Sequence, residues 1–473
     1  MRILLVYPNA NKEIIGWGDL GAIAEPLALE YLAAGGRLEG HDVQILDLRL
    51  RPHHLDLVLL AYQPDVVGVT GYSMHVLRNL AICRRARQLL PHTHTVVGGH
   101  HATLLPEDFF DPCIDYVVVG EGVQPFRRVL RALDRGEDVR GVPGVWSRVD
   151  GAVAFGGEQP ALDIDSIPFP DRSETEADRS SYYIDWMKPI ALMRTTVGCP
   201  YRCSFCALWR IMDGRYHKRA CDRVVEELRQ IPEHYVFLVD DEPFVNVRRM
   251  RELAQAIRAA SLHKEYFAYC RIDSFLRDRG LMESWRELGL RRVFFGIETI
   301  FANELKDYNK RQQLDQIIEA LRVARSLDIA VFANFIIRPD YSAVEFAEIV
   351  KFIERCEVSY PSFTILTPIP GTEANFDAVL ERQPNGRPNW EYFDLQHPVT
   401  KTRLPKEEFM LEYRNLWRVF ANHYRDAQHP FHLEMDQVRQ SAPAVSAVTA
   451  ACRPAVAGFW PVETIGGSSA SRG

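Results

Sequence analysis

Three cysteines stand close together in the chain, and their spacing is typical of metal ligands. Cys199, Cys203 and Cys206 lie within eight residues in the order Cys-x3-Cys-x2-Cys. Three thiolates at this spacing can reach one compact metal centre, but the loop contains no fourth cysteine. Iron–sulfur clusters and structural zinc sites usually have four protein ligands, so one metal position is left for a ligand that is not protein.

Two metal centres are compatible with three cysteines. A structural zinc ion would need a remote fourth ligand, for which His217 is a candidate. A [4Fe-4S] cluster would keep one iron open. The pattern around the loop also matters, because an apolar strand is expected over 190–196 directly before it and a helix after it.

The segment from Thr195 to Cys206 resembles the cysteine loop of the radical S-adenosylmethionine (SAM) enzymes, which lies between a strand and a helix in the same way. The resemblance implies that the three cysteines hold a [4Fe-4S] cluster and that SAM binds the open iron as a source of radicals. Phe205 matches the family position whose main chain contacts the adenine of SAM.

Composition narrows the class of protein. A chain of 473 residues is expected to form two or three domains. Its net charge of −7 gives no electrostatic reason to expect a nucleic acid partner. The six other cysteines are scattered along the chain, which favours a reducing compartment over a disulfide framework. Without a long apolar run or a signal-peptide pattern, a cytoplasmic protein is expected.

The first 140 residues alternate between strand and helix patterns. This alternation predicts an α/β domain built on a doubly wound, Rossmann-like parallel sheet. Ligands of such sheets bind at the carboxyl ends of the strands. The expected strands are 2–7, 42–48, 66–70, 95–98 and 115–119, and the expected helices are 26–38, 76–90 and 124–133.

Glycine-containing loops follow three of these strands. Their order resembles that of the cobalamin-binding domain that precedes the barrel in one large subclass of radical SAM enzymes. The Asp-x-His-x-x-Gly motif that supplies a cobalt ligand is absent, and none of His75, His100 and His101 is assigned to that role. The cobalamin-binding residues implied by the resemblance are Thr70, Tyr72, Ser73, Gly98, Gly99, Gly120 and Glu121.

The middle of the chain predicts a linker followed by a barrel. Residues 141–188 are rich in glycine, proline and acidic residues, and we expect a surface linker without regular structure. Residues 189–372 then repeat a strand–helix unit six times, which predicts a partial (β/α)6 barrel with its active site at the carboxyl ends of the strands. Its expected strands are 190–196, 235–239, 266–271, 292–296, 330–337 and 362–367.

Polar residues follow several of the barrel strands. By resemblance, Asp240, Asp241 and Glu242 are expected near the amino group of SAM. Arg271 and Asp273 are expected near its ribose and carboxylate, and Glu298 belongs to a Gly-x-Glu signature.

The C-terminal part is expected to be a small helical region over 373–434. An amphipathic pattern over 404–425 predicts a helix whose aromatic face packs on the barrel, with a membrane-surface helix as the alternative. Residues 435–473 are rich in alanine, serine, proline and glycine, and we expect them to be disordered.

Together these resemblances imply a methyltransferase that uses a [4Fe-4S] cluster, SAM and cobalamin to methylate an unactivated carbon. An electron donor such as flavodoxin or ferredoxin is implied as partner. A narrower resemblance, to the bacterial hopanoid C-3 methylases, implies a small hydrophobic, polycyclic lipid substrate and transient contact with a membrane surface. It is carried by residues 198–206, 237–244, 285–290, 338–339 and 366–372.

Two other functions remain open from the sequence. A cobalamin-dependent methylase or oxidative cyclase acting on a tetrapyrrole or another secondary metabolite would have the same motifs. A non-catalytic corrinoid-binding protein would need no cluster, so loss of all function in Cys203→Ala while cobalamin stays bound would rule it out.

Overall fold

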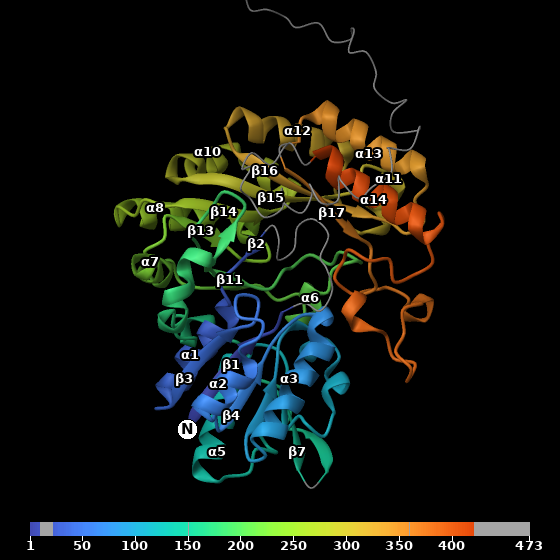
Figure 1. Cartoon of the computed structure of the whole chain (residues 1–473). Coiled ribbons are helices and arrows are strands. Elements are labelled where there is room, and N and C mark those ends of the chain that lie inside the picture. Colours follow the sequence, from blue (N-terminus) through green and yellow to red (C-terminus); the bar gives the residue numbers. More distant parts are fainter. Residues whose placement is uncertain (10–21, 150, 359, 421–473) are drawn as a thin grey trace, which may run out of the picture.

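The computed structural model describes residues 1–9, 22–149, 151–358 and 360–420, which form an α/β protein with two sheets (Figure 1). The N-terminal sheet lies at the bottom of the view and the barrel at the top, so the two predicted architectures are confirmed. The tail predicted over 435–473, and residues 421–434 of the predicted helical region, lie outside the described residues.

The N-terminal sheet has seven strands in the order β3-β1-β4-β5-β6-β7-β8. The five predicted strands pair in parallel, with β1 between β3 and β4. This order reverses direction between β1 and β4, which is where doubly wound sheets bind their ligands. The parallel strands are β1 (Arg2–Tyr7), β3 (Asp42–Asp47), β4 (Val66–Val69), β5 (His94–Val97) and β6 (Tyr116–Val118).

Helices cover both faces of this sheet because its central strands are apolar on both sides. In β1, Ile3 and Leu5 belong to one core and Leu4 and Val6 to the other. Helices α1 and α5 pack together on the first side, and α2 and α3 on the second. Their bounds are α1 (Leu27–Leu38), α2 (Leu55–Tyr62), α3 (Val76–Leu89) and α5 (Val123–Arg135), and a short α4 (His100–Leu104) follows β5.

The predicted linker is more structured than its composition suggested. Strands β7 (Val145–Val149) and β8 (Ala152–Phe155) form an antiparallel hairpin that extends the first sheet from β6. The prediction that residues 141–188 lack regular structure is therefore wrong, and the first domain extends to Phe155. Further along, β9 (Tyr183–Ile184) pairs with β2 (Ala22–Ile23), and Ile167 is fully buried. The short length of these strands hid them among glycines and prolines.

The second sheet is a partial barrel of six parallel strands in chain order, β10-β13-β14-β15-β16-β17. All six predicted strands are confirmed. The Tyr266 ring contacts Trp285 of α10 (Arg279–Leu288), and the Phe335 ring contacts Phe352 of α13 (Ala343–Cys356). Tyr266 and Phe335 therefore point outward, and the residues next to them in each strand point into the barrel. The strands are β10 (Ile190–Met193), β13 (Tyr235–Leu238), β14 (Glu265–Cys270), β15 (Leu290–Glu298), β16 (Ala330–Ile337) and β17 (Tyr360–Ile365).

Seven helices of the described residues accompany these strands on the outside of the barrel (Figure 1). They are α7 (Cys221–Gln230), α8 (Val247–Ala259), α9 (Ile272–Arg277), α10 (Arg279–Leu288), α11 (Ala302–Asp307), α12 (Leu314–Ser326) and α13 (Ala343–Cys356).

A buried arginine closes the barrel at the amino-terminal ends of its strands. Arg292 of β15 is fully buried and donates to Asp185 at 2.9 Å. Four aromatic rings surround its guanidinium at 4.5 to 5.1 Å: Trp186, Phe267, Phe332 and Tyr360. Cation–π contacts and one carboxylate thus replace the water that this charge loses on burial.

Replacing Arg292 with methionine is expected to lower the free energy of unfolding by about 3 kcal/mol, because Asp185 then keeps a buried charge without the opposite charge of the guanidinium. Chemical denaturation of the two proteins measures the difference. The double variant Arg292→Met/Asp185→Asn should recover part of the loss. An equal loss in both variants would mean that packing, and not the buried charge of Asp185, sets the cost.

The C-terminal residues contact both domains. Trp390 and Phe393 pack into the core of the first domain, and the Trp390 ring meets His101 at 4.6 Å. Helix α14 (Lys406–Phe420) instead packs on the barrel, where Trp417 meets Phe363. The predicted packing on the barrel is confirmed for the described part of the helix, whereas 373–405 contains only two short 3₁₀ helices.

No helix in the described ranges combines the length and hydropathy that crossing a bilayer requires.

Candidate active site

Two buried side chains fix the start of the cysteine loop. Asp240 accepts hydrogen bonds from the main-chain nitrogens of Thr195 and Thr196 at 2.6 and 2.5 Å and from the Thr195 hydroxyl at 2.7 Å. Arg249 donates to the Thr195 carbonyl at 3.0 Å. Asp240 is fully buried with both oxygens engaged by the loop, and its predicted contact with a cofactor stays a prediction. It is a positioning residue.

Glycine is required where the loop turns toward the cysteines. Gly198 has φ +87°, and a Cβ atom there would lie 2.1 Å from the Arg215 carbonyl oxygen. Its main-chain nitrogen donates to Asp241 at 3.0 Å. The main chain at the start of the loop is therefore closely packed between the segment that precedes β12 (His217–Lys218) and the carboxyl end of β13.

The surroundings of the three thiols fit an iron–sulfur cluster. Burial raises the pKa of Cys199 to about 12 and that of Cys206 to about 11, so the thiolates need added positive charge. Iron supplies that charge on binding. The Arg271 guanidinium lies 3.6 Å from the Cys203 sulfur, and Trp209 donates its indole N–H to the Cys203 carbonyl at 3.3 Å.

The zinc alternative gains no support. No three His, Cys, Asp or Glu side chains in the described ranges are arranged to hold a single metal ion. His217 lies in β12, where its Nε2 is buried without a hydrogen-bond partner among these residues.

Arg271, directly after β14, holds the cysteine loop through several contacts. It donates to Asp273 at 2.8 Å and to the Lys310 carbonyl at 2.6 Å, and it stacks on Tyr201 at 3.7 Å. Glu242 is almost fully buried and accepts from the Arg271 main-chain nitrogen at 2.8 Å. Glu242 thus supports Arg271 and is covered in this structure, and its predicted contact with the cofactor stays a prediction. Contacts of Arg271 and Asp273 with SAM remain predictions.

A buried ion pair lies at the end of β15, beside the loop. Glu298, in a left-handed conformation with φ 65°, pairs with Lys310, which also donates to the Gly296 carbonyl at 2.5 Å. The Lys310 amine lies 5.9 Å from the centre of the Phe205 ring. Nothing in the sequence singled out Lys310, because a lysine within a loop carries no pattern of its own.

Asp241 lies between the cysteine loop and the first domain. Burial, and then repulsion by Asp240, raise its pKa to about 6. Burial is also the main cause of the raised pKa of Tyr269, to which the neighbouring Tyr72 and the charge of Asp241 add. Because Tyr72 follows β4 and Tyr269 ends β14, the carboxyl ends of the two sheets face each other here.

Binding of SAM is expected to depend on the charge of Asp241. Since its pKa is about 6, the carboxylate gains charge as the pH rises through 6, and affinity for the SAM ammonium rises with it. Asp241→Asn should bind SAM about tenfold more weakly at neutral pH and lose this pH dependence. Equilibrium binding to anaerobically prepared protein measures both. Asp222→Asn, at an exposed acid of α7, is the control, and a pH dependence unchanged in Asp241→Asn would contradict the assignment.

The glycine loops of the first domain form a close-packed edge. Gly99 has φ +100°, and a Cβ atom there would lie 2.7 Å from the Thr70 hydroxyl and 2.8 Å from the Gly71 main chain. Ser73 is buried and bonds to His101 at 3.0 Å. The Tyr72 ring is 52% exposed and stacks on His100 at 4.8 Å, which presents a flat surface to a flat ligand. Gly98, at the end of β5, lies on the same edge.

The histidines near these loops differ in their contacts. His101 has both ring nitrogens engaged, by Ser73 and Asp108 at 3.0 Å each. Burial lowers the pKa of His75 and of His100 to about 4, so both are neutral. No contact identifies one of them as a cobalt ligand.

The third glycine loop joins the two domains. Glu121 lies 3.7 Å from Arg194 at the end of β10 and accepts from the Val123 main chain. Gln159 covers Gly120, where a Cβ atom would lie 3.0 Å from its amide nitrogen. This loop therefore holds the domains together, and its predicted role in binding cobalamin is not tested.

Some inward-facing side chains near the carboxyl ends of the barrel strands are partly exposed. Inward-facing residues nearer the amino-terminal ends of the strands, such as Phe267 and Phe332, are fully buried. Nearer the carboxyl ends, Tyr269 and Phe294 are partly exposed, and their rings lie 5.0 Å apart. Asn334, also partly exposed, donates to Thr364 at 3.2 Å. A wall with aromatic and amide groups thus faces the region of the cysteine loop.

Known proteins share both halves of this arrangement. The B12 binding domain family matches residues 15–130, and the Radical SAM superfamily matches residues 193–353. The chain is 34% identical to the hopanoid C-3 methylase of Methylococcus capsulatus over 86% of its own length and 78% of that protein. The chain belongs to the cobalamin-dependent radical SAM methyltransferases. Its cofactors are accordingly a [4Fe-4S] cluster, SAM and cobalamin.

Other similar proteins agree with this family. The anaerobic magnesium-protoporphyrin IX monomethyl ester cyclase of Rubrivivax gelatinosus is 27% identical over 90% of this chain and 77% of that protein. The radical SAM methyltransferase TsrM of Kitasatospora setae, solved with cobalamin and a [4Fe-4S] cluster, shares the fold with a TM-score of 0.64. It is 20% identical, and the match covers 81% of this chain and 79% of that one.

Within this family the site residues divide into two tasks. Cys199, Cys203 and Cys206 are the residues that would hold the cluster, and Asp240, Arg249 and Arg271 hold their loop in place. When bound, the three cofactors together supply a radical and a methyl group. The family assignment thus explains why the carboxyl ends of both sheets face one another.

Proposed function

We propose that this methyltransferase methylates an unactivated carbon of a flat, polycyclic lipid, at C-3 of a hopanoid. The observation that carries the proposal is the 34% identity to a hopanoid C-3 methylase across both domains. The partly exposed aromatic wall of the barrel supports it, because Tyr269 and Phe294 offer apolar faces to an apolar ring system.

The chain's residues would orient such a substrate and exclude water. Because the buried Arg292 closes the barrel at the amino-terminal ends of its strands, a substrate would lie on the next layer of side chains, toward the carboxyl ends. There Tyr269 and Phe294 would contact the rings, and the Asn334–Thr364 pair would meet a polar group. Asp241 and Arg271 lie at the rim, where a charged cofactor fits better than a lipid.

The test is methylation of defined substrates by anaerobically reconstituted enzyme. We expect a hopanoid to gain one methyl group, detected by mass spectrometry, with formation of S-adenosylhomocysteine and 5′-deoxyadenosine. Phe294→Ala should lower methylation at least about tenfold while SAM cleavage continues, because it removes substrate contact only. Equal methylation by Phe294→Ala would argue against this substrate position.

A cyclase is the second candidate, because cyclases are among the similar proteins. It would form 5′-deoxyadenosine without S-adenosylhomocysteine, so the same assay separates the two. If no hopanoid is methylated but a tetrapyrrole is, the reaction class stands and the lipid assignment fails. We further propose a cytoplasmic enzyme that contacts the membrane surface transiently to collect its substrate.

A further inference from the structure

Positive charge is concentrated around the cysteine loop. Residues 201–220 contain five basic residues and one acidic residue, whereas the whole chain has a net charge of −7. Four of the five are exposed, and none of these four forms an ion pair within the described residues. We call them the loop cations: Arg202, Arg210, Arg215 and Lys218.

Two of the loop cations, Arg202 and Arg210, contact Trp209, which in turn contacts Cys203. The guanidinium groups of Arg202 and Arg210 lie 5.4 and 4.1 Å from the centre of the Trp209 ring. Trp209 is 8% exposed and donates to the Cys203 carbonyl at 3.3 Å. A partner seated on these arginines would therefore be separated from the main chain of Cys203 by a single indole ring.

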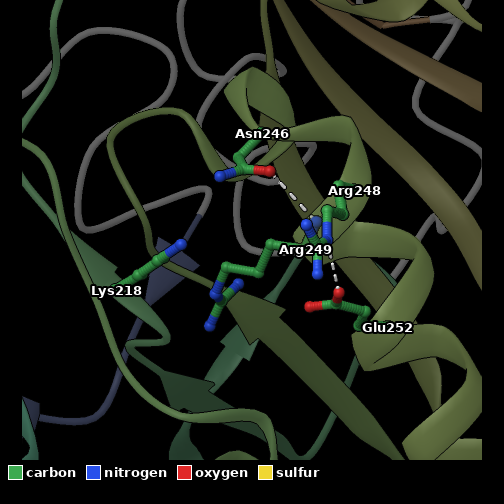
Figure 2. A pocket seen from close by; sticks show the side chains of 5 residues that line it. All are labelled: Lys218, Asn246, Arg248, Arg249 and Glu252. Atoms are coloured by element: carbon green, nitrogen blue, oxygen red, sulfur yellow. Dashed lines mark hydrogen bonds and ion pairs between the residues drawn. The ribbon is translucent and has the colours of Figure 1, made fainter.

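Lys218 adds a pocket to this surface. Figure 2 shows its side chain at a pocket of about 400 Å³ that Asn246, Arg248, Arg249 and Glu252 also line. Glu252 pairs with Arg248 at 2.8 Å, so Lys218 has room for a carboxylate from outside. Arg249 at the back of the pocket donates to the Thr195 carbonyl, and β12 pairs Lys218 with Thr196. The pocket is thus built on the strand that begins the cysteine loop.

We propose that the loop cations form the docking surface for an acidic one-electron carrier protein. The cluster must gain one electron for SAM cleavage, and the carrier would lose that electron while bound. Opposite charges steer such encounters and raise the association rate. The proposal rests on the radical SAM chemistry of the chain and not on the identity of its substrate.

Binding of an acidic flavodoxin to the anaerobically reconstituted holoenzyme tests the surface. The double variant Arg202→Glu/Lys218→Glu is expected to bind at least about tenfold more weakly than the wild type at low salt. Added salt should weaken wild-type binding and affect the variant less. Arg229→Glu makes the same kind of charge change at an exposed residue in the last turn of α7, and it should bind as the wild type does.

A second measurement separates docking from damage to the cofactor site. 5′-Deoxyadenosine formation without lipid substrate should be unchanged in the double variant when dithionite is the reductant and should fall at least about tenfold when flavodoxin is. Iron content is measured in parallel. The proposal is overturned by equal flavodoxin affinity, by a parallel loss with dithionite, or by a wild type that binds neither flavodoxin nor a ferredoxin. None of these outcomes depends on whether a hopanoid is methylated.

Discussion

Replacing Cys203 with alanine is expected to abolish SAM cleavage and methyl transfer while cobalamin stays bound. Cys203 is the central thiol of the loop, 8% exposed, and it contacts both the Arg271 guanidinium and, through its carbonyl, Trp209. With two thiolates left, the loop lacks one of the three protein ligands that a [4Fe-4S] cluster with one open iron needs. Activity should fall by more than about a thousandfold.

Three measurements check this prediction. Iron content and cluster absorbance should be lost, 5′-deoxyadenosine formation should stop, and cobalamin should bind with wild-type affinity, because its predicted loops are elsewhere. Cys221→Ala is the matched control, since Cys221 is a partly exposed cysteine at the start of α7 and outside the loop. SAM cleavage or methyl transfer that survives in Cys203→Ala would contradict the role of Cys203 as a cluster ligand.

Replacing Gly99 with alanine is expected to weaken cobalamin binding while the cluster is retained. A Cβ atom at this position would lie 2.7 to 2.8 Å from Thr70 and Gly71, in a backbone conformation that alanine adopts only with strain. Strain of about 1 to 3 kcal/mol, if relieved by movement of the loops, corresponds to about a 5- to 150-fold loss of cobalamin affinity. Methyl transfer should fall with it.

The two glycines of this loop permit a matched comparison. At Gly98 a Cβ atom would make only ordinary contacts, 3.7 Å from the Val118 carbonyl. Gly98→Ala should therefore fold normally, so any loss of cobalamin affinity would report direct contact with the ligand. Gly141→Ala, where nothing lies within 4 Å of the added atom, controls for expression and folding. In Gly99→Ala, iron content should remain that of the wild type. Unchanged cobalamin affinity in this variant would place the ligand elsewhere.

Some site residues could not be found from the sequence. Asp240, Asp241 and Glu242 were equivalent as consecutive acids, yet Asp240 and Glu242 are buried and only Asp241 faces the space between the domains. The direction of each side chain depends on the bend of the chain after β13. Lys310 and Trp209 likewise act through contacts with residues that the sequence does not link to them.

The sequence by itself determined the cysteine spacing, which predicts the cluster ligands, and the two sheet patterns. Cys199, Cys203 and Cys206 are near in sequence, and the apolar runs of β1 or β16 follow from the burial of individual strands. Such features are local, so spacing and residue type suffice to predict them.

Only the tertiary structure decided how these parts meet. The Glu121–Arg194 contact, the packing of Trp390 on His101 and the addition of the β7–β8 hairpin to the first sheet all join segments whose own patterns are weak. Each depends on which surfaces remain uncovered after the two cores have formed. Composition indicated a linker without regular structure and gave no sign of contacts between residues 373–405 and the first domain, whereas burial of apolar area drew both segments against the domains.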